Sequence, residues 1–259
     1  MREFLEDAEK HRDDGYGRAQ KHVRGVRPKR FYKSTGVDVV SGGFAVTLDG
    51  KPTLTPGRKP MVVPVSGIAT RIAAEWGAQD KEIDPDTMPM LRLINAAVEG
   101  GDEAVPGLRD EVIKYAAGDL LLYRADGPAA LAAEQERLWD AALVKLARHF
   151  GLSFQPTIGI IHQEQPAATI ARLRTAIEGE NHFVLTPLVA LTGITGSGLL
   201  AIGFWHRLFT ADEIWAAAHV DEDYQIRVWG EVEEIAARRE ERRRDFDAAV
   251  DALEMLRAG

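Results

Sequence analysis

Three short stretches of the sequence contain residue types that could carry out chemistry. The first, GSGLLA from Gly196 to Ala201, matches the G-x-G-x-x-[GA] pattern, whose glycines let a helix N-terminus approach the pyrophosphate of a dinucleotide. That pattern normally follows a strand and precedes an acid by about 20 residues. Here the preceding segment reads as an apolar helix, which favours a glycine-rich turn between two closely packed helices over dinucleotide binding.

The other two stretches are acidic. HVDEDY, residues 219 to 224, holds three carboxylates, and clustered oxygen ligands suit a hard cation such as calcium. On a helix these side chains fan around the axis, and no glycine supplies the sharp turn of a calcium loop, so the pattern favours a solvated acidic face. Asp119 follows Gly118 and precedes LLLYR. It could be a catalytic acid, but this position is more typical of a cap for the next element.

Common catalytic signatures are absent from the sequence. It has no G-x-S-x-G elbow, no phosphate-binding P-loop, no H-E-x-x-H pair and no cysteine. Its seven histidines are never three or four residues apart, the spacing that places two imidazoles on one helix face; they are His11, His22, His149, His162, His182, His206 and His219. We therefore expect no catalytic set, no metal site and no cofactor.

Composition narrows the class of partner. The 259 residues are 45% hydrophobic and 28% charged, as in a soluble globular protein. The net charge of −8 argues against binding to nucleic acid or to an anionic membrane surface. The first residues lack the apolar run of a signal peptide and the acid-poor composition of a transit peptide. We expect a cytoplasmic protein without membrane insertion, with a polar, flexible arm over residues 1–28.

An α+β unit is predicted after this arm, over residues 29–100. GGFAVTLDGKPTLTP alternates apolar and polar residues before Asp49-Gly50, a pair suited to a tight hairpin turn. PMVVPV gives a further short edge strand. Ser66 is expected to cap a helix in which Ile68, Ile72 and Trp76 share one face. The result is a small antiparallel sheet with a helix packed on it.

Residues 101–259 are predicted to be almost entirely helical. Long helical patterns cover 102–118 and 128–150, the latter ended by Gly151. Further helices are expected over 166–178 and 183–208, and a last long one from a Thr210 cap through Trp215, Tyr224 and Trp229. The β-branched segment LSFQPTIGII is the exception, and is predicted to form a strand that returns to the N-terminal sheet.

The stretch YQIRVWGEVEE, residues 224 to 234, bears most directly on function. On one continuous helix, Asp221, Gln225 and Trp229 would share a line with Val232, Ile235 and Ala236. Trp229 would then lie where an apolar stripe meets a charged one. It either seals the core beside solvated charges or anchors a contact with a partner protein, since tryptophan and tyrosine are frequent binding anchors. Spacing alone leaves both interpretations open.

Seven segments resemble the family of assembly chaperones that attend the alpha subunit of the F-type ATP synthase catalytic head, in mitochondria and some bacteria. They occur in the family's order over roughly residues 29 to 245. They are KRFYK at 29–33, GFAVTLDGKPTLTPGRKPMVVP at 43–64, IAAEWGAQ at 72–79, TMPMLRLINAAVEG at 87–100, GDLLLYRADGP at 118–128, QERLWDAAL at 135–143 and YQIRVWGEVEE at 224–234.

The resemblance implies an α+β N-terminal domain, an orthogonal all-α C-terminal domain and no enzymatic activity. It implies that the chain binds the free alpha subunit and shields the surface that later meets the beta subunit. The residues matched for partner contact are Tyr224, Gln225, Trp229, Glu231, Glu233 and Glu234, and those matched for structural roles are Trp76, Arg92, Asn95, Asp119, Tyr123 and Arg124. Two alternatives are a generic protein-binding chaperone and a small-molecule or nucleotide-binding enzyme that uses GSGLLA with Asp119 or a histidine.

Overall fold

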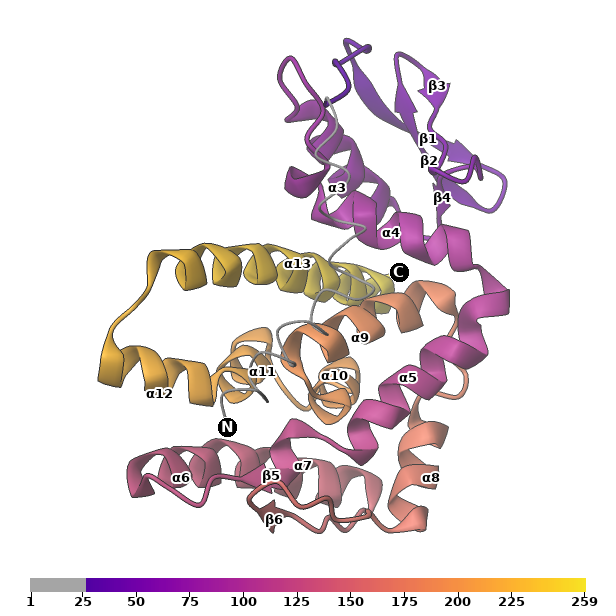
Figure 1. Cartoon of the computed structure of the whole chain (residues 1–259). Coiled ribbons are helices and arrows are strands. Elements are labelled where there is room, and N and C mark those ends of the chain that lie inside the picture. The colour runs from indigo at the N-terminus through magenta and orange to yellow at the C-terminus, as the bar shows by residue number, and fades with distance from the viewer. Residues whose placement is uncertain (1–26) are drawn as a thin grey trace, which may run out of the picture.

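A computed structural model describes residues 27–259 and shows an α+β protein (Figure 1). The antiparallel N-terminal sheet contains β1 (Thr35–Val40), β2 (Gly43–Leu48), β3 (Lys51–Pro52) and β4 (Val62–Val63), and both β3 and β4 pair with β2. The predicted hairpin turn is confirmed, because Asp49 and Gly50 have φ angles of +49° and +73°. The double positive φ matches the twist of the flanking strands.

Two helices cover this sheet, α3 (Ser66–Gly77) and α4 (Pro89–Gly100). Ile68 and Ile72 are fully buried on one face of α3, as their spacing predicts, and Trp76 packs against the same core. The prediction that Ser66 caps α3 is wrong. Val65 is the extended residue before the helix, so Ser66 already lies in the first turn, and no side chain caps this end.

A buried carboxylate joins the two helices. Glu75 of α3 accepts hydrogen bonds from the backbone N–H groups of Met90 (2.9 Å) and Leu91 (2.8 Å). These groups lie in the first turn of α4, where they have no partner within the helix. Burial raises the pKa of Glu75. The Glu75 side chain thus supplies the cap that Met88, the residue before α4, does not provide.

The rest of the described chain is mainly helical. Its helices are α5 (Val105–Ala117), α6 (Ala129–Gln135), α7 (Ala141–Phe150), α8 (Ala167–Ala176), α9 (His182–Thr195), α10 (Gly198–Trp205), α11 (Ala211–Ala218), α12 (Val220–Trp229) and α13 (Glu233–Ala258). A π-helical turn, Glu136–Asp140, joins α6 to α7, and Gly151 ends α7 in the left-handed conformation, as predicted. Short 3-10 turns occupy Pro85–Thr87, Asp102–Ala104 and Leu120–Leu122.

The segment LSFQPTIGII does not return to the N-terminal sheet. Its strand, β6 (Thr157–Ile158), pairs in parallel with β5 (Tyr123–Arg124) to form a separate two-stranded sheet. The prediction failed because β-branched composition indicates a strand but does not identify its partner. The local partner follows the turn after α5, within the helical part of the chain.

Two predicted long helices are each divided in the structure. The segment 183–208 forms α9 and α10, because Gly196 turns the chain at a φ angle of +68°. The helix predicted from Thr210 through Trp229 forms α11 and α12, which meet at His219. Its beginning is confirmed: Thr210 caps α11, with Glu213 completing a reciprocal capping box.

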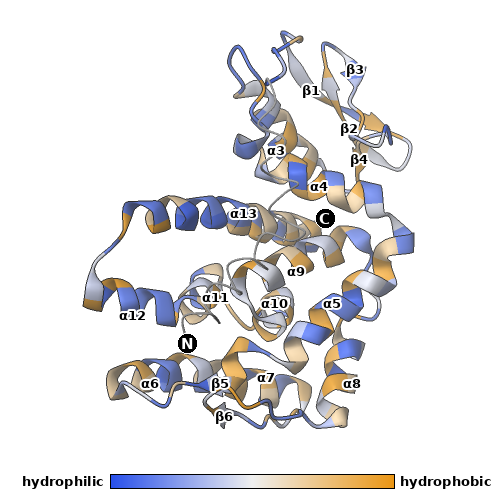
Figure 2. Cartoon of the chain, viewed as in Figure 1, coloured by the Kyte–Doolittle hydropathy of each residue, from blue (hydrophilic) through white to orange (hydrophobic). Residues whose placement is uncertain are grey.

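Two hydrophobic cores organise the molecule. One lies between the sheet, α3 and α4, and the other is enclosed by the helices that follow α4. The C-terminal half of α13 joins them, since Leu253 belongs to the helical core and Ala252 to the sheet core. Figure 2 shows α9 and α10 as largely apolar and the first half of α13 as hydrophilic. The domain boundary at residue 100 stays a prediction. Helix α4, which precedes it, contacts α9 and α13, which follow it.

Most of the predicted flexible arm, residues 1–28, lies outside the described residues. Its last two residues are attached to the segment between α3 and α4. Arg27 forms an ion pair with Asp84 (2.8 Å), and the carbonyl oxygen of Pro28 accepts a hydrogen bond from the N–H of Ile83 (2.8 Å).

Candidate protein-binding site

The stretch YQIRVWGEVEE forms the outer end of a helix pair. Helix α12 ends at Trp229, Gly230 reverses the chain with a φ angle of +86°, and α13 begins at Glu233. We call residues 224–235 the tip. In Figure 1 the tip projects away from the body of the molecule. The continuous helical face predicted from Asp221 to Ala236 is therefore wrong, because the chain turns between its two halves.

Apolar side chains are exposed at the tip. Trp229 is 76% exposed, and its neighbours Val228, Val232 and Ile235 are 52%, 56% and 45% exposed. The interpretation of Trp229 as a residue that seals the core is thus wrong. Exposed apolar side chains gathered at one place commonly mark a surface that binds a partner.

Carboxylates and two polar residues surround these apolar side chains. Glu231, Glu233 and Glu234 are all exposed. Glu234 pairs with Arg238 one turn further along α13 (2.5 Å), whereas Glu231 and Glu233 form no ion pair with residues 27–259. Tyr224 is half-buried at the base of the tip under the Arg227 guanidinium, and Gln225 is exposed. The tip is therefore an apolar surface with an acidic rim.

Arginine–carboxylate pairs hold α12 against α13. Arg239 lies 2.5 Å from Asp223, and Arg242 lies 2.8 Å from Glu222. The prediction of a solvated acidic face at HVDEDY is wrong for these two acids, because α13 returns antiparallel to α12 and places arginines opposite them. Part-buried pairs of this kind resist screening by salt better than exposed ones. They fix the orientation of the tip.

Helix α12 is also held from its other side. Arg227 pairs with Glu134 of α6 (2.5 Å), and the side-chain amide of Gln135 donates to Asp221 (2.7 Å). At the base of the pair, Trp215 stacks on His219 with ring centroids 3.9 Å apart and meets Phe246 edge-on at 4.9 Å. The helix pair that carries the tip is therefore held by contacts on both sides, and these contacts fix the positions of the exposed residues at its end.

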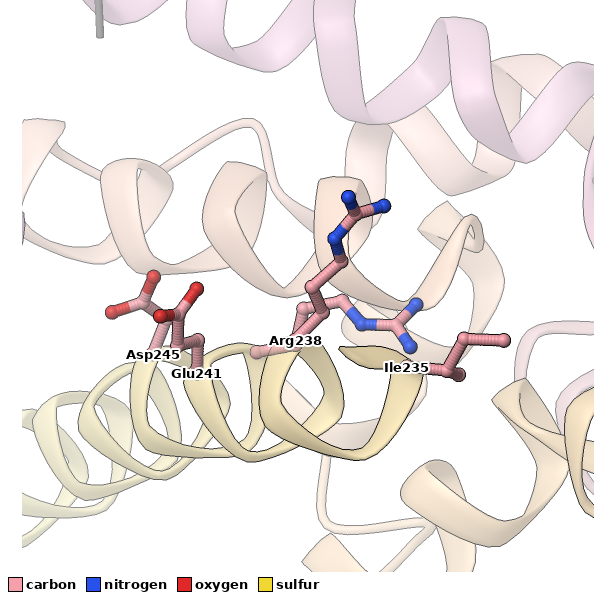
Figure 3. Close-up of a pocket in the computed structure, with 5 residues that line it drawn as sticks. Ile235, Arg238, Glu241 and Asp245 are labelled. Atoms are coloured by element: carbon pink, nitrogen blue, oxygen red, sulfur yellow. The ribbon is translucent and has the colours of Figure 1, made fainter. Parts of the chain in front are cut away.

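A hollow of about 480 Å³ continues from the tip along α13. Its described lining residues all come from α13; they are Ile235, Arg238, Glu241, Arg242 and Asp245. Figure 3 shows these side chains projecting from the helix. Small-molecule sites are usually enclosed and mostly apolar. A hollow that is lined by charged side chains of both signs from one helix is better suited to contact the surface of another protein than to enclose a small molecule.

The residues matched for structural roles in the N-terminal part lie on α3 and α4. Trp76 meets Tyr32 edge-on at 5.4 Å, and its carbonyl oxygen accepts a hydrogen bond from the Tyr32 hydroxyl (2.7 Å). Arg92 donates to Asp245 and so links α4 to α13. The Asn95 Oδ1 atom is buried and has no hydrogen-bond partner within residues 27–259. Among these residues only Arg92 makes a side-chain bond between the two parts of the molecule.

Asp119 is the most constrained of the polar residues. It is completely buried, and its two carboxylate oxygens accept from the N–H groups of Leu121 (3.1 Å) and Leu199 (2.9 Å). It therefore caps the turn after α5, as its position in the sequence indicates, and also satisfies the first turn of α10. Burial raises the pKa of Asp119 to about 7, against the opposing effect of these hydrogen bonds. The neighbouring Ser197 is also completely buried, and its hydroxyl caps α10, so neither side chain is open to a substrate.

Tyr123 and Arg124 follow in β5. The Tyr123 hydroxyl is 2.7 Å from Nδ1 of His162. The Arg124 guanidinium pairs with Asp140 and lies over the Trp139 ring, 5.1 Å from its centroid. Burial lowers the pKa of Arg124. These contacts tie β5 to the loop after β6 and to the π-helical turn.

The GSGLLA stretch is a turn between packed helices. A side chain at Gly198 would meet the carbonyl oxygen of Val112 at 2.3 Å and the N–H nitrogen of Ala116 at 2.8 Å. Because α5 approaches α10 so closely, Gly198 serves packing here. Within residues 27–259 no three histidine or carboxylate side chains are grouped as a metal would require, and no helix is long and apolar enough to cross a bilayer.

Comparison with known proteins gives one consistent result. Residues 29–147 match the family model described as ATP12 chaperone protein. Atu1473 from Agrobacterium tumefaciens has 38% sequence identity to this chain. Its crystal structure matches with a TM-score of 0.84 and covers 88% of this chain and 86% of its own. The crystal structure of Atp12 from Paracoccus denitrificans is 32% identical, with a TM-score of 0.77 over 88% of this chain and 97% of that one.

A more distant relative is the mitochondrial protein atp12 of Schizosaccharomyces pombe, 22% identical over 80% of this chain and 75% of its own length. Fold and relatives together define an assembly chaperone and not an enzyme. The chain belongs to the ATP12 chaperone family, whose members act in ATP synthase assembly and catalyse no reaction.

Proposed function

We propose that this chaperone binds the free alpha subunit of the F-type ATP synthase catalytic head through the α12–α13 tip. The observation that carries the proposal is the exposure of Trp229, 76%, at the end of a braced helix pair. Apolar residues are normally exposed together in this way where a partner covers them. A tryptophan that is surrounded by smaller apolar side chains is a frequent centre of binding energy.

The rim of the tip defines the chemistry of the partner surface. Glu231, Glu233 and Glu234 surround Trp229 on an exposed segment, so the complementary surface on the alpha subunit is expected to be apolar with lysine or arginine at its edge. Tyr224 and Gln225 would add contacts on the α12 side. The charged hollow along α13 extends the same surface away from the tip.

A surface of this size also accounts for release of the alpha subunit. We propose that the chaperone covers the part of alpha that later meets beta until beta replaces it. Permanent subunit interfaces bury roughly 2,000 Å² or more, and a projecting tip with a few exposed apolar residues offers much less. Because the two surfaces compete for the same part of alpha, the larger interface displaces the smaller one. We place this exchange in the bacterial cytoplasm, in keeping with the bacterial relatives.

Reversing the charge of the acidic rim tests this proposal. Changing Glu231, Glu233 and Glu234 together to lysine is expected to weaken alpha-subunit binding about tenfold, with the larger effect at low salt. Glu233 and Glu234 lie in the first turn of α13, where the helix dipole favours acids, so a stability loss of about 1 kcal/mol is expected as well. Isothermal titration calorimetry with purified alpha subunit, alongside thermal unfolding, separates the two effects.

The matched control reverses three exposed acids far from the tip, Glu82, Glu103 and Glu178, and so changes the net charge equally. Its affinity for the alpha subunit should stay within twofold of wild type. Equal affinities of the rim variant and the wild type would rule out the acidic contact.

A further inference from the structure

A second group of exposed apolar residues lies at the end of β6 and on the loop that follows it. Ile158, Ile160 and Ile161 are 71%, 95% and 79% exposed. We call residues 158–161 the isoleucine loop. Single exposed apolar residues are common on protein surfaces, but three isoleucines within four positions are not. The apolar character that suggested a strand in the sequence is thus presented to solvent.

The isoleucine loop is held at its base. The N–H of Gly159 donates to the carbonyl oxygen of Arg124 (2.8 Å), and Tyr123 binds His162 immediately after the loop (2.7 Å). Gln165, 5% exposed, donates to the carbonyl oxygens of Gln155 (3.0 Å) and Gln163 (3.1 Å), which closes the segment. The isoleucines therefore project from a fixed base.

Hydrogen bonds connect this base to α12, the helix that leads into the tip. Gln135, 2% exposed, accepts a hydrogen bond from the N–H of Ala125 (2.8 Å) and donates to Asp221 of α12 (2.7 Å). Arg124, which holds Gly159, also donates to the carbonyl oxygen of Gln135 (3.4 Å). The isoleucine loop and helix α12, whose outer end belongs to the tip, are thus attached to the same buried glutamine.

Size and charge restrict what covers the isoleucine loop. Three side chains provide far less than the roughly 800 Å² per partner of a stable interface, so the loop needs a partner that is also held elsewhere. Residues 152–166 contain no lysine or arginine, which disfavours an anionic membrane surface. We propose that the isoleucine loop is a second contact with the client that the tip binds, on an apolar part of the alpha subunit. This inference rests on the proposed function.

Two linked contacts would strengthen each other, because the first makes the second intramolecular. Changing Ile158, Ile160 and Ile161 together to serine should weaken alpha-subunit binding at least tenfold and leave the thermal unfolding midpoint close to that of wild type. The matched control changes Phe31, Val39 and Leu54 to serine; these residues are 74%, 82% and 55% exposed on the N-terminal part. The control should bind the alpha subunit as wild type does.

Calorimetry with purified alpha subunit, light scattering and vesicle sedimentation distinguish the possible results. Weakened binding by the serine variant with an intact control supports the second contact. If Trp229→Ala weakens binding and the serine variant does not, the second contact is wrong and the proposed function stands. If wild type ignores folded alpha subunit, both are wrong. A change only in self-association or in binding to anionic vesicles would assign the loop to another copy or to lipid, and overturn the inference.

Discussion

Asp119→Asn is expected to lower the free energy of unfolding at pH 5 by about 3 kcal/mol. Asp119 is completely buried, and both of its oxygens accept backbone hydrogen bonds, one from Leu121 and one from Leu199. An asparagine keeps the shape but turns one acceptor into a donor, which would face an N–H group that also donates. One of the two N–H groups would then lose its acceptor, and the first turn to which it belongs would lose its cap.

The size of this loss should depend on pH. The pKa of Asp119 is raised from 3.8 to about 7 in the folded protein, so between these values the folded state keeps a proton that the unfolded chain releases. Stability contributed by this group therefore falls as pH rises. The difference between wild type and Asp119→Asn should shrink by about 1.4 kcal/mol per pH unit from pH 5 to 7.

Urea unfolding at pH 5, 6, 7 and 8 measures both effects, and comparison with the variant cancels the other titrating groups. Asp126→Asn is the control, since Asp126 is exposed a few residues further along and its change should cost less than about 0.5 kcal/mol. A difference that stays constant with pH would mean that Asp119 is already ionised at pH 5 in the folded protein.

Trp229→Ala is expected to weaken binding to the alpha subunit by about 2 kcal/mol, or roughly 30-fold. Because Trp229 is 76% exposed and lies where α12 ends, its removal leaves the arginine–carboxylate pairs of the helix pair in place. The thermal unfolding midpoint should hardly change. Affinity is measured by calorimetry with purified alpha subunit.

Phe31→Ala is the matched control for this change. Phe31 is an aromatic residue of similar exposure, 74%, on the N-terminal part of the molecule, and its removal should leave the affinity unaltered. A Trp229→Ala variant that binds as tightly as wild type, or that unfolds instead of losing affinity, would contradict the assignment of Trp229 to the contact.

Elements specified by local chemistry were predictable from the sequence. Asp49-Gly50 permits only a narrow set of turns, and Gly151 ends α7 in a conformation that other residues avoid. At the start of α11, the Thr210 and Glu213 side chains each accept a hydrogen bond from the other's backbone N–H. Asp119 could likewise be interpreted as a cap from its neighbours. Its second role, at the start of α10, depends on a residue 80 positions away.

The shape of the tip could not be predicted from helical spacing. Gly230 stands inside a pattern that otherwise continues as a helix, and a single glycine costs only about 1 kcal/mol there, so spacing alone did not show the chain reversal. The same reversal brings Arg239 and Arg242 opposite Asp223 and Glu222 on α12. The exposure of Trp229 depends on that reversal. The sequence alone therefore could not decide whether Trp229 seals the core or lies on the surface.

The most direct test of the central claim is co-purification of this chaperone with the free alpha subunit of its own organism, followed by addition of the beta subunit. We expect a stable complex with alpha, from which beta releases the chaperone as the alpha–beta contact forms. A folded alpha subunit that does not bind the chaperone, or a complex that persists unchanged when beta is added, would contradict the account.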